Sequence, residues 1–468
     1  MEIWKENEGG WDPNNFFDRQ FGIHREIFYL PQKNNYTDLS SGVNYLPIPT
    51  IWKETMQKEL EEDFLYQQYT ATTGFQAVKY AVKLYERFLY SGGDIFLQAD
   101  LDVSMTIGAS QAMDIALDYL RSLGKREMLL VGLTYPLYKM LGDQYGYQIK
   151  ETRSALPNRD MPTAGELITA IETKKPEVIV FSYPCNPSGE TYTDEELDWI
   201  MGILHEKGIH CIFDCVCNMI VSKNEAVFPE AHIMKHRMLE KCIIVNSLSK
   251  TESVPGFRIG YIAGDYNLMN FVRTKQAMLM NPPNIPAIAI WITMLFRCLY
   301  LSEQYGQTEK ERERIIKCFK KMFMATTELC SQNVRDYVKE LVERRIWDEY
   351  EMFKSEALAK EKTFTSNKTY LSEKLSFFII GETRMDTGFN YLIKLNTCKC
   401  VGELELCKEL LHKAGIAVFT ESGFALKPAK EDDYWIRISL ALPEKEFEAA
   451  VDRMYEVLDE IGGERTNI

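Results

Sequence analysis

A regular alternation of apolar runs with amphipathic segments, between about residues 95 and 264, constrains the fold more than any other feature of this chain. We interpret four short apolar runs as buried strands: 128–132, 178–182, 210–214 and 242–246. Segments with helical spacing lie between them, such as 193–207. This order predicts an α/β unit with a mainly parallel sheet and helices on both faces. Ligands of such sheets bind beyond the carboxyl ends of the strands.

The C-terminal third has a different pattern. The run 307–380 contains neither Gly nor Pro and is rich in Glu, Lys, Arg, Leu and Met, which predicts long helices. Shorter elements are expected after it: a strand at 388–395, a helix at 402–414, strands near Ala417 and Ile436, and a helix at 444–461. Because 468 residues exceed one typical domain, we expect a second, smaller α+β domain here.

Composition and charge exclude several classes of protein. The net charge is −14 and no basic patch offsets it, which disfavours nucleic acid as a partner. No run of about 18 apolar residues predicts a membrane span, and the acidic N-terminus lacks the apolar core of a signal peptide. The eleven scattered cysteines favour free thiols in a reducing compartment. We therefore expect a cytoplasmic protein with no membrane or nucleic-acid partner.

Two Cys-x-Cys pairs, Cys215/Cys217 and Cys398/Cys400, are the nearest approach to a metal motif. One intervening residue is not the usual zinc spacing, and only His210 lies within a few residues of either pair. No metal site is expected.

The stretch Val-Asn-Ser-Leu-Ser-Lys-Thr-Glu-Ser-Val-Pro-Gly-Phe-Arg-Ile-Gly, at 245–260, carries the strongest chemical signal. It places Lys250 in a loop directly after a strand, and Arg258 follows eight residues later between two glycines. An amine, several hydroxyls and a guanidinium suit a site for a phosphorylated aldehyde. The lysine would form a Schiff base, and the hydroxyls and the arginine would hold the phosphate.

Two further charged residues lie in apolar strands. Asp214 ends the run 210–214, where a carboxylate can pair with a protonated ring nitrogen. Arg437 lies within the apolar run 434–440, and a partly buried arginine needs an anionic partner. A substrate carboxylate bound by both arms of the guanidinium would supply that partner.

The Lys250 stretch resembles the lysine motif of fold-type I pyridoxal-phosphate (PLP) enzymes, and class I/II aminotransferases in particular. Four other segments are similar to motifs of that family: Thr-Ile-Gly-Ala-Ser-Gln at 106–111, Tyr-Pro at 135–136, Asn-Pro-Ser-Gly at 186–189 and Arg-Ile-Ser at 437–439. The resemblance runs from about Asp38 to the C-terminus. It implies an aminotransferase-like large domain with a mainly parallel sheet and a smaller α+β domain.

The resemblance also implies roles for individual residues. The implied PLP-phosphate ligands are Ala109, Ser110, Gln111, Ser247 and Arg258, with Tyr69 reaching the phosphate across a dimer interface. At the ring, Tyr135 would stack on one face, Asn186 would donate to the phenolic oxygen, and Asp214 would pair with the pyridine nitrogen. The implied substrate contacts are Gly42, Asn186 and Arg437, and the implied catalytic pair is Lys250 and Asp214.

One position departs from the family pattern. A tyrosine often follows the aspartate by three residues and bonds the same phenolic oxygen, but here that residue is Cys217. A thiol is a weaker donor than a phenol. The reaction outcome is therefore open, although PLP binding is still expected.

The implied domain boundaries are 1–75 for an N-terminal arm that joins the small domain, 76–320 for the large PLP domain and 321–468 for the small domain. The resemblance implies a long helix near Glu309 that crosses between domains. The interval from Lys250 to Arg437 is longer than the family usually needs. We place the surplus at about 331–369, either as a decorating helical insert or as a substrate lid.

Together these features predict a homodimeric PLP-dependent aminotransferase that uses amino acid and 2-oxo acid substrates. A PLP-dependent lyase, decarboxylase, cyclase or oxidase is the nearest alternative, and Cys217 is the feature that favours it. A PLP-sensing regulatory protein is a minor alternative, because no helix-turn-helix pattern precedes the family match.

Overall fold

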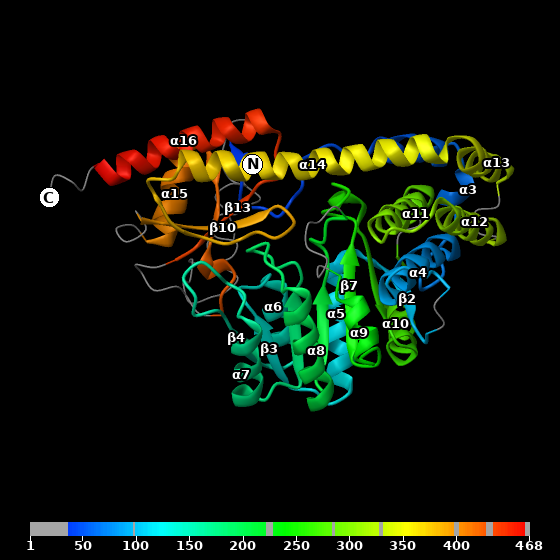
Figure 1. The fold of residues 1–468 in the computed structure, drawn as a ribbon, viewed down its shortest axis with the longest axis horizontal. Helices are drawn as coiled ribbons and strands as arrows, with labels where there is room; N and C mark the ends of the chain where they lie inside the picture. The colour runs from blue at the N-terminus through cyan, green and yellow to red at the C-terminus, as the bar shows by residue number, and fades with distance from the viewer. Residues whose placement is uncertain are drawn as a thin grey trace, which may run out of the picture.

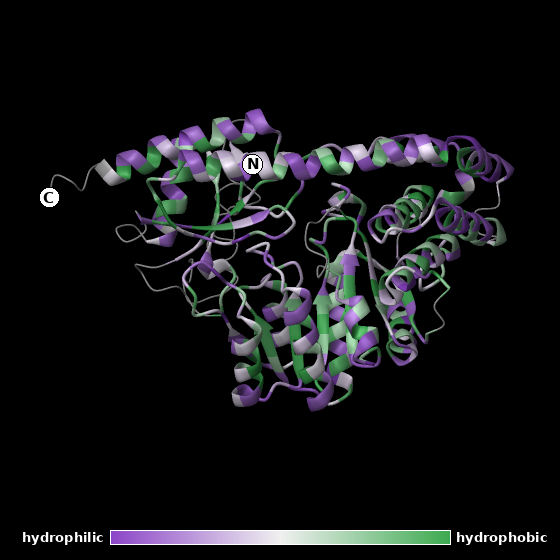
Figure 2. Cartoon of the chain, in the orientation of Figure 1, coloured by the Kyte–Doolittle hydropathy of each residue, from purple (hydrophilic) through white to green (hydrophobic). Residues whose placement is uncertain are grey.

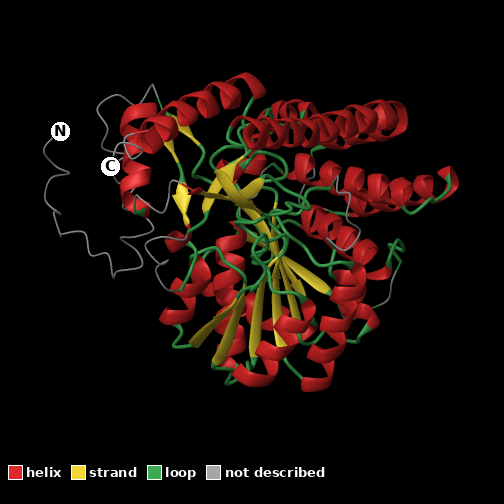
Figure 3. Ribbon diagram, turned by 60° about the vertical axis from the view of Figure 1, so that its left-hand side comes forward, coloured by secondary structure: helices red, strands yellow, loops and turns green. Residues whose placement is uncertain are grey.

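A seven-stranded central sheet forms the middle of the protein (Figures 1 and 3). The computed structural model describes residues 36–96, 99–220, 228–282, 286–326, 331–396, 402–426 and 434–463. The strands of the central sheet, in spatial order, are β2 (Asp102–Ile107), β8 (Ile259–Gly264), β7 (Cys242–Ser247), β6 (His210–Asp214), β5 (Val178–Ser182), β3 (Glu127–Val131) and β4 (Gln148–Thr152). Only β8 runs antiparallel to its neighbours. The α/β class with a mainly parallel sheet is therefore confirmed.

Helices cover both faces of this sheet because successive strand residues point to opposite sides. Leu129, Ile179 and Ile244 belong to one apolar core, together with residues of the first set of helices. Leu130 and Val180 belong to a second core on the other face. The first set is α4 (Gln76–Ser91), α7 (Ala164–Lys174), α8 (Asp194–Lys207), α9 (Glu230–Lys235) and α11 (Ala287–Gln304). The opposite face carries α5 (Gly108–Ser122), α6 (Leu137–Gln144) and α10 (Tyr266–Leu279). Figure 2 shows the central strands as a mainly hydrophobic layer.

Local sequence signals fix where several of these helices begin. The side chains of Thr163, Thr193 and Thr308 each accept a hydrogen bond from the backbone N–H three residues later. The residue at that third position is a glutamate, and its carboxylate accepts a hydrogen bond from the backbone N–H of the threonine. This reciprocal cap satisfies N–H groups that a helix start leaves unpaired. The helices capped in this way are α7, α8 and α12 (Glu309–Ala325).

A smaller four-stranded antiparallel sheet lies beside the central one. Its order is β12 (Phe419–Thr420), β13 (Ile436–Ser439), β10 (Asn390–Leu395) and β9 (Ile379–Glu382). Helices α15 (Glu403–Ala414) and α16 (Glu444–Gly463) pack with this C-terminal sheet in a separate apolar core. The short strand β1 (Thr37–Asp38) pairs with β11 (Ile416–Ala417), so the chain just after residue 35 joins the C-terminal elements.

The helix that links the two parts is not the one expected from the sequence. Helix α12, which begins at Glu309, packs against α4 and α11 and stays beside the central sheet. The crossing helix is α14 (Ile346–Lys374), which contacts α2 (Thr50–Leu60) and α11 as well as α16 (Figure 1). The placement of the crossing helix near Glu309 was therefore wrong.

The range 331–369 is helical as expected, but it is not a peripheral decoration. It comprises α13 (Gln332–Glu340), one π-helical turn (Leu341–Arg345) and most of α14. A further short α-helix, α3, spans Asp63–Tyr66. Within the described ranges, no helix is both long enough and apolar enough to span a bilayer.

Candidate active site

A cavity of about 440 Å³ lies beyond the carboxyl ends of the parallel strands. It brings together most of the residues singled out from the sequence: Gly42, Ala109, Ser110, Tyr135, Asn186, Asp214, Cys217, Ser247, Lys250, Arg258 and Arg437. They come from the last residues of β6 and β7, from the segments that follow β2, β3, β5, β6 and β7, from the N-terminal segment, and from β13 of the C-terminal sheet. Their convergence follows from the topology, since parallel strands end at one edge of the sheet.

One end of the cavity is shaped for an anion. Helix α5 begins there, and the positive end of its dipole and its free N–H groups favour negative charge. Gly108, at φ +69°, allows the guanidinium of Arg258 to approach, because a Cβ would lie 2.6 Å from its Nη2. The hydroxyl of Ser247 donates to that of Ser249 over 2.7 Å. An exposed guanidinium, two hydroxyls and a helix start thus converge at one place.

Lys250 lies in the loop that follows β7. Its backbone carbonyl accepts a bond of 2.8 Å from Nδ2 of Asn44, which anchors the loop to the N-terminal segment. Burial lowers the pKa of the Lys250 amine, and the nearby guanidinium groups of Arg437 and Arg258 act in the same direction. A lowered pKa increases the fraction of neutral amine, which is the form that acts as nucleophile or base.

Asp214 ends β6 and is held from two sides. The hydroxyl of Tyr138 donates to its Oδ2 over 2.5 Å, and the backbone N–H of Val216 donates to its Oδ1 over 3.2 Å. Burial raises the pKa of the Asp214 carboxyl to about 6, and the two hydrogen bonds limit that rise. A cationic nitrogen placed against the Asp214 carboxylate would lower its pKa again.

Arg437 projects from β13 toward the rings of Phe419 and Phe424, whose centroids lie 5.5 and 4.8 Å from its Cζ. Nη1 donates to Oδ1 of Asn186 over 2.9 Å, and Nη2 donates to the carbonyl of Ser40. Its Nε is buried and has no hydrogen-bond partner among the described residues. Burial lowers the pKa of this guanidinium to about 10. A buried cation with an unused donor is suited to a carboxylate ligand.

Cys217 lines the cavity between Asp214 and the C-terminal sheet. Nδ2 of Asn390 donates to its Sγ over 3.6 Å. Burial raises the pKa of the thiol to about 11, so the group is neutral at ordinary pH. Cys217 therefore offers only a weak hydrogen-bond donor at this position.

Two of the residues singled out from the sequence lie elsewhere. Gln111 does not line the cavity, since its Oε1 accepts the backbone N–H of Ile107 over 2.8 Å and caps the start of α5. Tyr69 is 95% exposed and is also absent from the cavity wall. Their assigned roles, and those of the cavity residues, stay predictions.

Sequence reasoning missed several residues that the fold brings to the site. Tyr138 had been given no role toward Asp214, but its hydroxyl donates to that carboxylate. Its place three residues after Tyr135 was the available signal. Asn44, Phe419 and Phe424 had no motif to mark them. Asn44 bonds to Lys250, 206 positions away, and the two phenylalanines contact Arg437, which follows them by 18 and 13 positions.

Only the first of the two Cys-x-Cys pairs lies within the described residues. Cys215 and Cys217 are buried free thiols, whereas Cys398 and Cys400 lie outside the described residues. Among the residues that the structure describes, no group of three or more His, Cys, Asp or Glu side chains is placed to hold a metal ion.

Comparison with known proteins finds one family model and several partial relatives. The family model for aminotransferase class I and II matches residues 34–454. A probable N-acetyl-LL-diaminopimelate aminotransferase of Bacillus subtilis is 27% identical over 52% of this chain and 58% of that protein. A 1-aminocyclopropane-1-carboxylate synthase 3 of Solanum lycopersicum is 28% identical over 30% of this chain and 32% of that protein. The chain thus matches less than two thirds of the length of these relatives.

Solved structures show the same fold. The aspartate aminotransferase of Thermus thermophilus with maleate aligns over 94% of this chain and 96% of its own, with a TM-score of 0.65 and 17% identity. At that identity the likeness concerns the fold alone.

Proposed function

The chain belongs to the class I and II aminotransferase family, and from this premise we propose that it is a PLP-dependent aminotransferase. It would move an amino group from an amino acid to a 2-oxo acid. The observation that carries the proposal is the single cavity in which Lys250, Asp214, Arg258 and Arg437 meet. Each of these groups suits a different part of the cofactor or the substrate.

The donor set of the cavity fits PLP. The start of α5, Ser247 and Arg258 would hold the phosphate, where the missing Cβ of Gly108 leaves room for the guanidinium. Asp214, fixed by Tyr138, would face the pyridine nitrogen, and a proton on that nitrogen would lower the carboxyl pKa that burial raises. When bound, PLP supplies an electron sink for the carbanion formed at the substrate α-carbon.

The residues of this chain would then have distinct tasks. Arg437 and Asn186 orient the substrate through its α-carboxylate. The amine of Lys250, whose pKa burial lowers, acts first as a base that takes the proton from the substrate α-carbon. It then acts as an acid that gives this proton back in the course of the transfer. Asp214 holds the proton on the ring nitrogen. The surrounding rings of Tyr135, Phe419 and Phe424 limit the access of water to these groups.

The proposed substrates are an amino acid and a 2-oxo acid, and the proposed assembly is a homodimer in the cytoplasm. The exposure of Tyr69 supports a dimer, because a tyrosine that completes a partner's phosphate site would lie on the surface of the single chain.

A screen of amino donors, read out for both 2-oxo acid and free ammonia, tests the proposal. The expected result is formation of 2-oxo acid that depends on an added oxo-acid acceptor. Lys250→Ala should abolish it, whereas Lys241→Ala, just before the start of β7, should leave it unchanged. Equal activity of wild type and Lys250→Ala would refute the proposed function.

A second reaction class has one observation in its favour. Cys217 replaces a phenol that helps to hold the cofactor's phenolic oxygen, and one relative with a partial match is named a synthase rather than an aminotransferase. A PLP-dependent lyase, decarboxylase, cyclase or oxidase would therefore use the same site. Release of ammonia or loss of carbon dioxide without need of an acceptor would favour this class. Nothing observed here favours the minor alternative of a PLP-sensing regulator.

A further inference from the structure

Helix α14 packs against both apolar cores, and a buried lysine of this helix, Lys360, lies where it passes from one core to the other. Its inner face is formed by side chains spaced alternately four and three residues apart: Phe353, Ala357, Lys360, Phe364, Asn367 and Leu371. Phe353 packs against Phe296 of α11, with ring centroids 5.4 Å apart. Phe364 packs against Phe389, next to β10, at 5.7 Å. Lys360 lies between these two contacts and is only 6% exposed.

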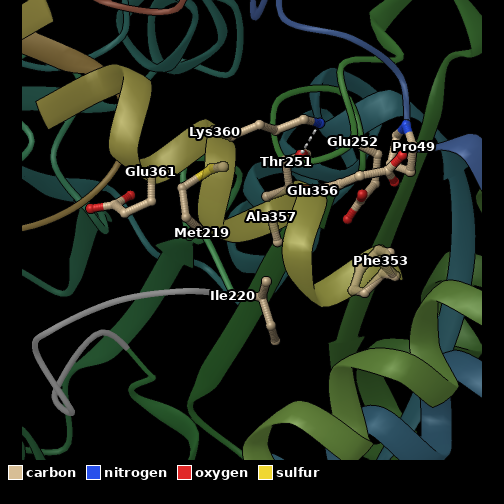
Figure 4. Close-up of a pocket in the computed structure, with 10 residues that line it drawn as sticks. All are labelled: Pro49, Met219, Ile220, Thr251, Glu252, Phe353, Glu356, Ala357, Lys360 and Glu361. Atoms are coloured by element: carbon tan, nitrogen blue, oxygen red, sulfur yellow. Dashed lines mark hydrogen bonds between the residues drawn. The ribbon is translucent and has the colours of Figure 1, made fainter. Parts of the chain in front are cut away.

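The ammonium of Lys360 reaches the loop that carries Lys250. Its Nζ donates to the carbonyl of Thr251 over 3.3 Å and to Oγ of Ser253 over 3.2 Å. Figure 4 shows the side chain extending from α14 toward Thr251, across the space lined by Met219 and Glu252. The cavity beside it measures about 20 Å³, which is room for one water molecule and not for a ligand. The amine therefore binds the loop and not a ligand.

The other contacts of this loop come from different elements. Asn44 holds the carbonyl of Lys250, and Arg297 of α11 donates to Oγ1 of Thr251 over 2.6 Å and to the carboxylate of Glu252 over 2.7 Å. Ser253 has φ +61°, a conformation that a non-glycine residue keeps only when its surroundings hold it. Lys360 is thus one of the few groups that fix a strained turn three residues after the proposed catalytic amine.

The same face of α14 also touches the strand that carries Arg437. Two turns beyond Lys360, Nδ2 of Asn367 donates to the carbonyls of Leu440 and Leu442 over 2.8 and 2.9 Å. These residues directly follow β13. One rigid helix therefore contacts both the loop of Lys250 and the strand end of Arg437.

We propose that Lys360 is a positioning residue for Lys250: from α14, its ammonium fixes the turn after Lys250, and so sets where that amine lies relative to Arg437. The inference rests on the proposed function, in which Lys250 moves the proton and Arg437 holds the substrate. Loss of the ammonium should loosen the turn without emptying the cofactor site, because Lys360 contacts none of the residues proposed to hold the cofactor.

The test compares wild type, Lys360→Met and Lys362→Met by amide hydrogen exchange and by steady-state kinetics on the full chain. Methionine keeps an unbranched side chain but donates nothing. In Lys360→Met, amides of residues 248–254 should exchange about tenfold faster, as expected for one lost charge-assisted bond. The kcat should fall about tenfold, while the visible absorbance of bound cofactor stays. Lys362 is exposed on the same helix, so Lys362→Met should match wild type in every readout.

Two results would overturn the positioning role. One is unchanged exchange of the turn in Lys360→Met. The other is faster exchange with kcat per bound cofactor unchanged, which would make Lys360 a structural residue only. If Lys360→Met does not fold, Ser253→Ala removes one acceptor of the same amine and should raise exchange of the turn about threefold; no change there would equally overturn the proposal. Hydrogen exchange needs no catalysis, so failure of the proposed function appears separately, as a wild type that transfers no amino group.

Discussion

At the scale of single residues, burial moves the two groups proposed to handle protons toward their neutral forms. It raises the pKa of Asp214 to about 6 and lowers the pKa of Lys250. Both shifts have the same cause, since a site with little water disfavours charge of either sign. A cationic ring between the two groups would restore the charge on Asp214 and leave a neutral base at Lys250.

Arg437 offers the first test at this scale. Arg437→Lys keeps the charge but loses the planar fork that would bind a carboxylate with two bonds and that also contacts Asn186. The KM for the amino donor should rise roughly 30-fold, about 2 kcal/mol, and the visible absorbance of bound cofactor should stay. Arg344→Lys, at an exposed arginine of the π-helical turn, serves as control. An unchanged KM in Arg437→Lys would rule out the carboxylate role.

Cys217 offers a second test, through pH. A phenol at this position would donate to the cofactor's phenolic oxygen and stabilise its ionised form, whereas the neutral thiol does so weakly. Cys217→Tyr should therefore lower the pH midpoint at which the visible absorbance of the loaded protein changes, by about one unit for one hydrogen bond. Cys217→Ser, of similar size to wild type, should shift it less. A folded, loaded Cys217→Tyr protein with no downward shift would show that residue 217 does not face this oxygen.

Local motifs were enough to predict many of the residues that line the cavity, because most of these motifs lie where a strand ends at one edge of the central sheet. The sequence could not indicate that Tyr138 donates to Asp214 or that Asn44 binds the Lys250 loop. Those pairings join residues 76 and 206 positions apart. Only the packing of separate elements creates them.

At the scale of elements, the entry to α5 depends on a conformation that suits glycine. Gly108 has φ +69°, and an added Cβ would lie 2.6 Å from Nη2 of Arg258. Gly108→Ala should destabilise the fold by about 1–2 kcal/mol and should also weaken cofactor retention by displacing the guanidinium. Gly124 also has a positive φ, +82°, but open space around it. Gly124→Ala should therefore lower stability through the backbone strain alone, without displacing a neighbouring side chain. Thermal unfolding and equilibrium dialysis of PLP measure the two effects, and equal retention of PLP in both variants would contradict the role of Arg258.

The element boundaries were predictable where glycine, proline or a capping threonine marks them, as at the start of α8. Within the run 307–380, Thr308 marks the start of α12, but no glycine or proline marks where the later helices begin and end. Its high helix propensity is uniform, so the sequence could not indicate which helix crosses between the cores. Packing decides it, because α14 is the one helix among the described residues that contributes side chains to both cores.

At the scale of the whole molecule, the described cavity lacks one contact that the family resemblance implies. Tyr69 is 95% exposed and lies away from the cavity of its own chain. In a homodimer it would complete the phosphate site of the other subunit. Tyr69→Phe should then weaken PLP retention about fivefold, for one lost hydrogen bond of about 1 kcal/mol. Tyr66→Phe, at a half-exposed tyrosine nearby, should leave PLP retention unchanged. A fully active monomer in sedimentation would contradict the dimer.

Covalent labelling of Lys250 tests the central claim most directly. The purified protein, incubated with PLP and reduced with borohydride, should carry the cofactor on the peptide that contains Lys250, and mass spectrometry should locate it there. Lys250→Ala should take up no label, and Lys241→Ala should be labelled like wild type. A label on any other lysine, or none on a folded protein with PLP in excess, would contradict the assignment of Lys250 and of this cavity as a PLP site.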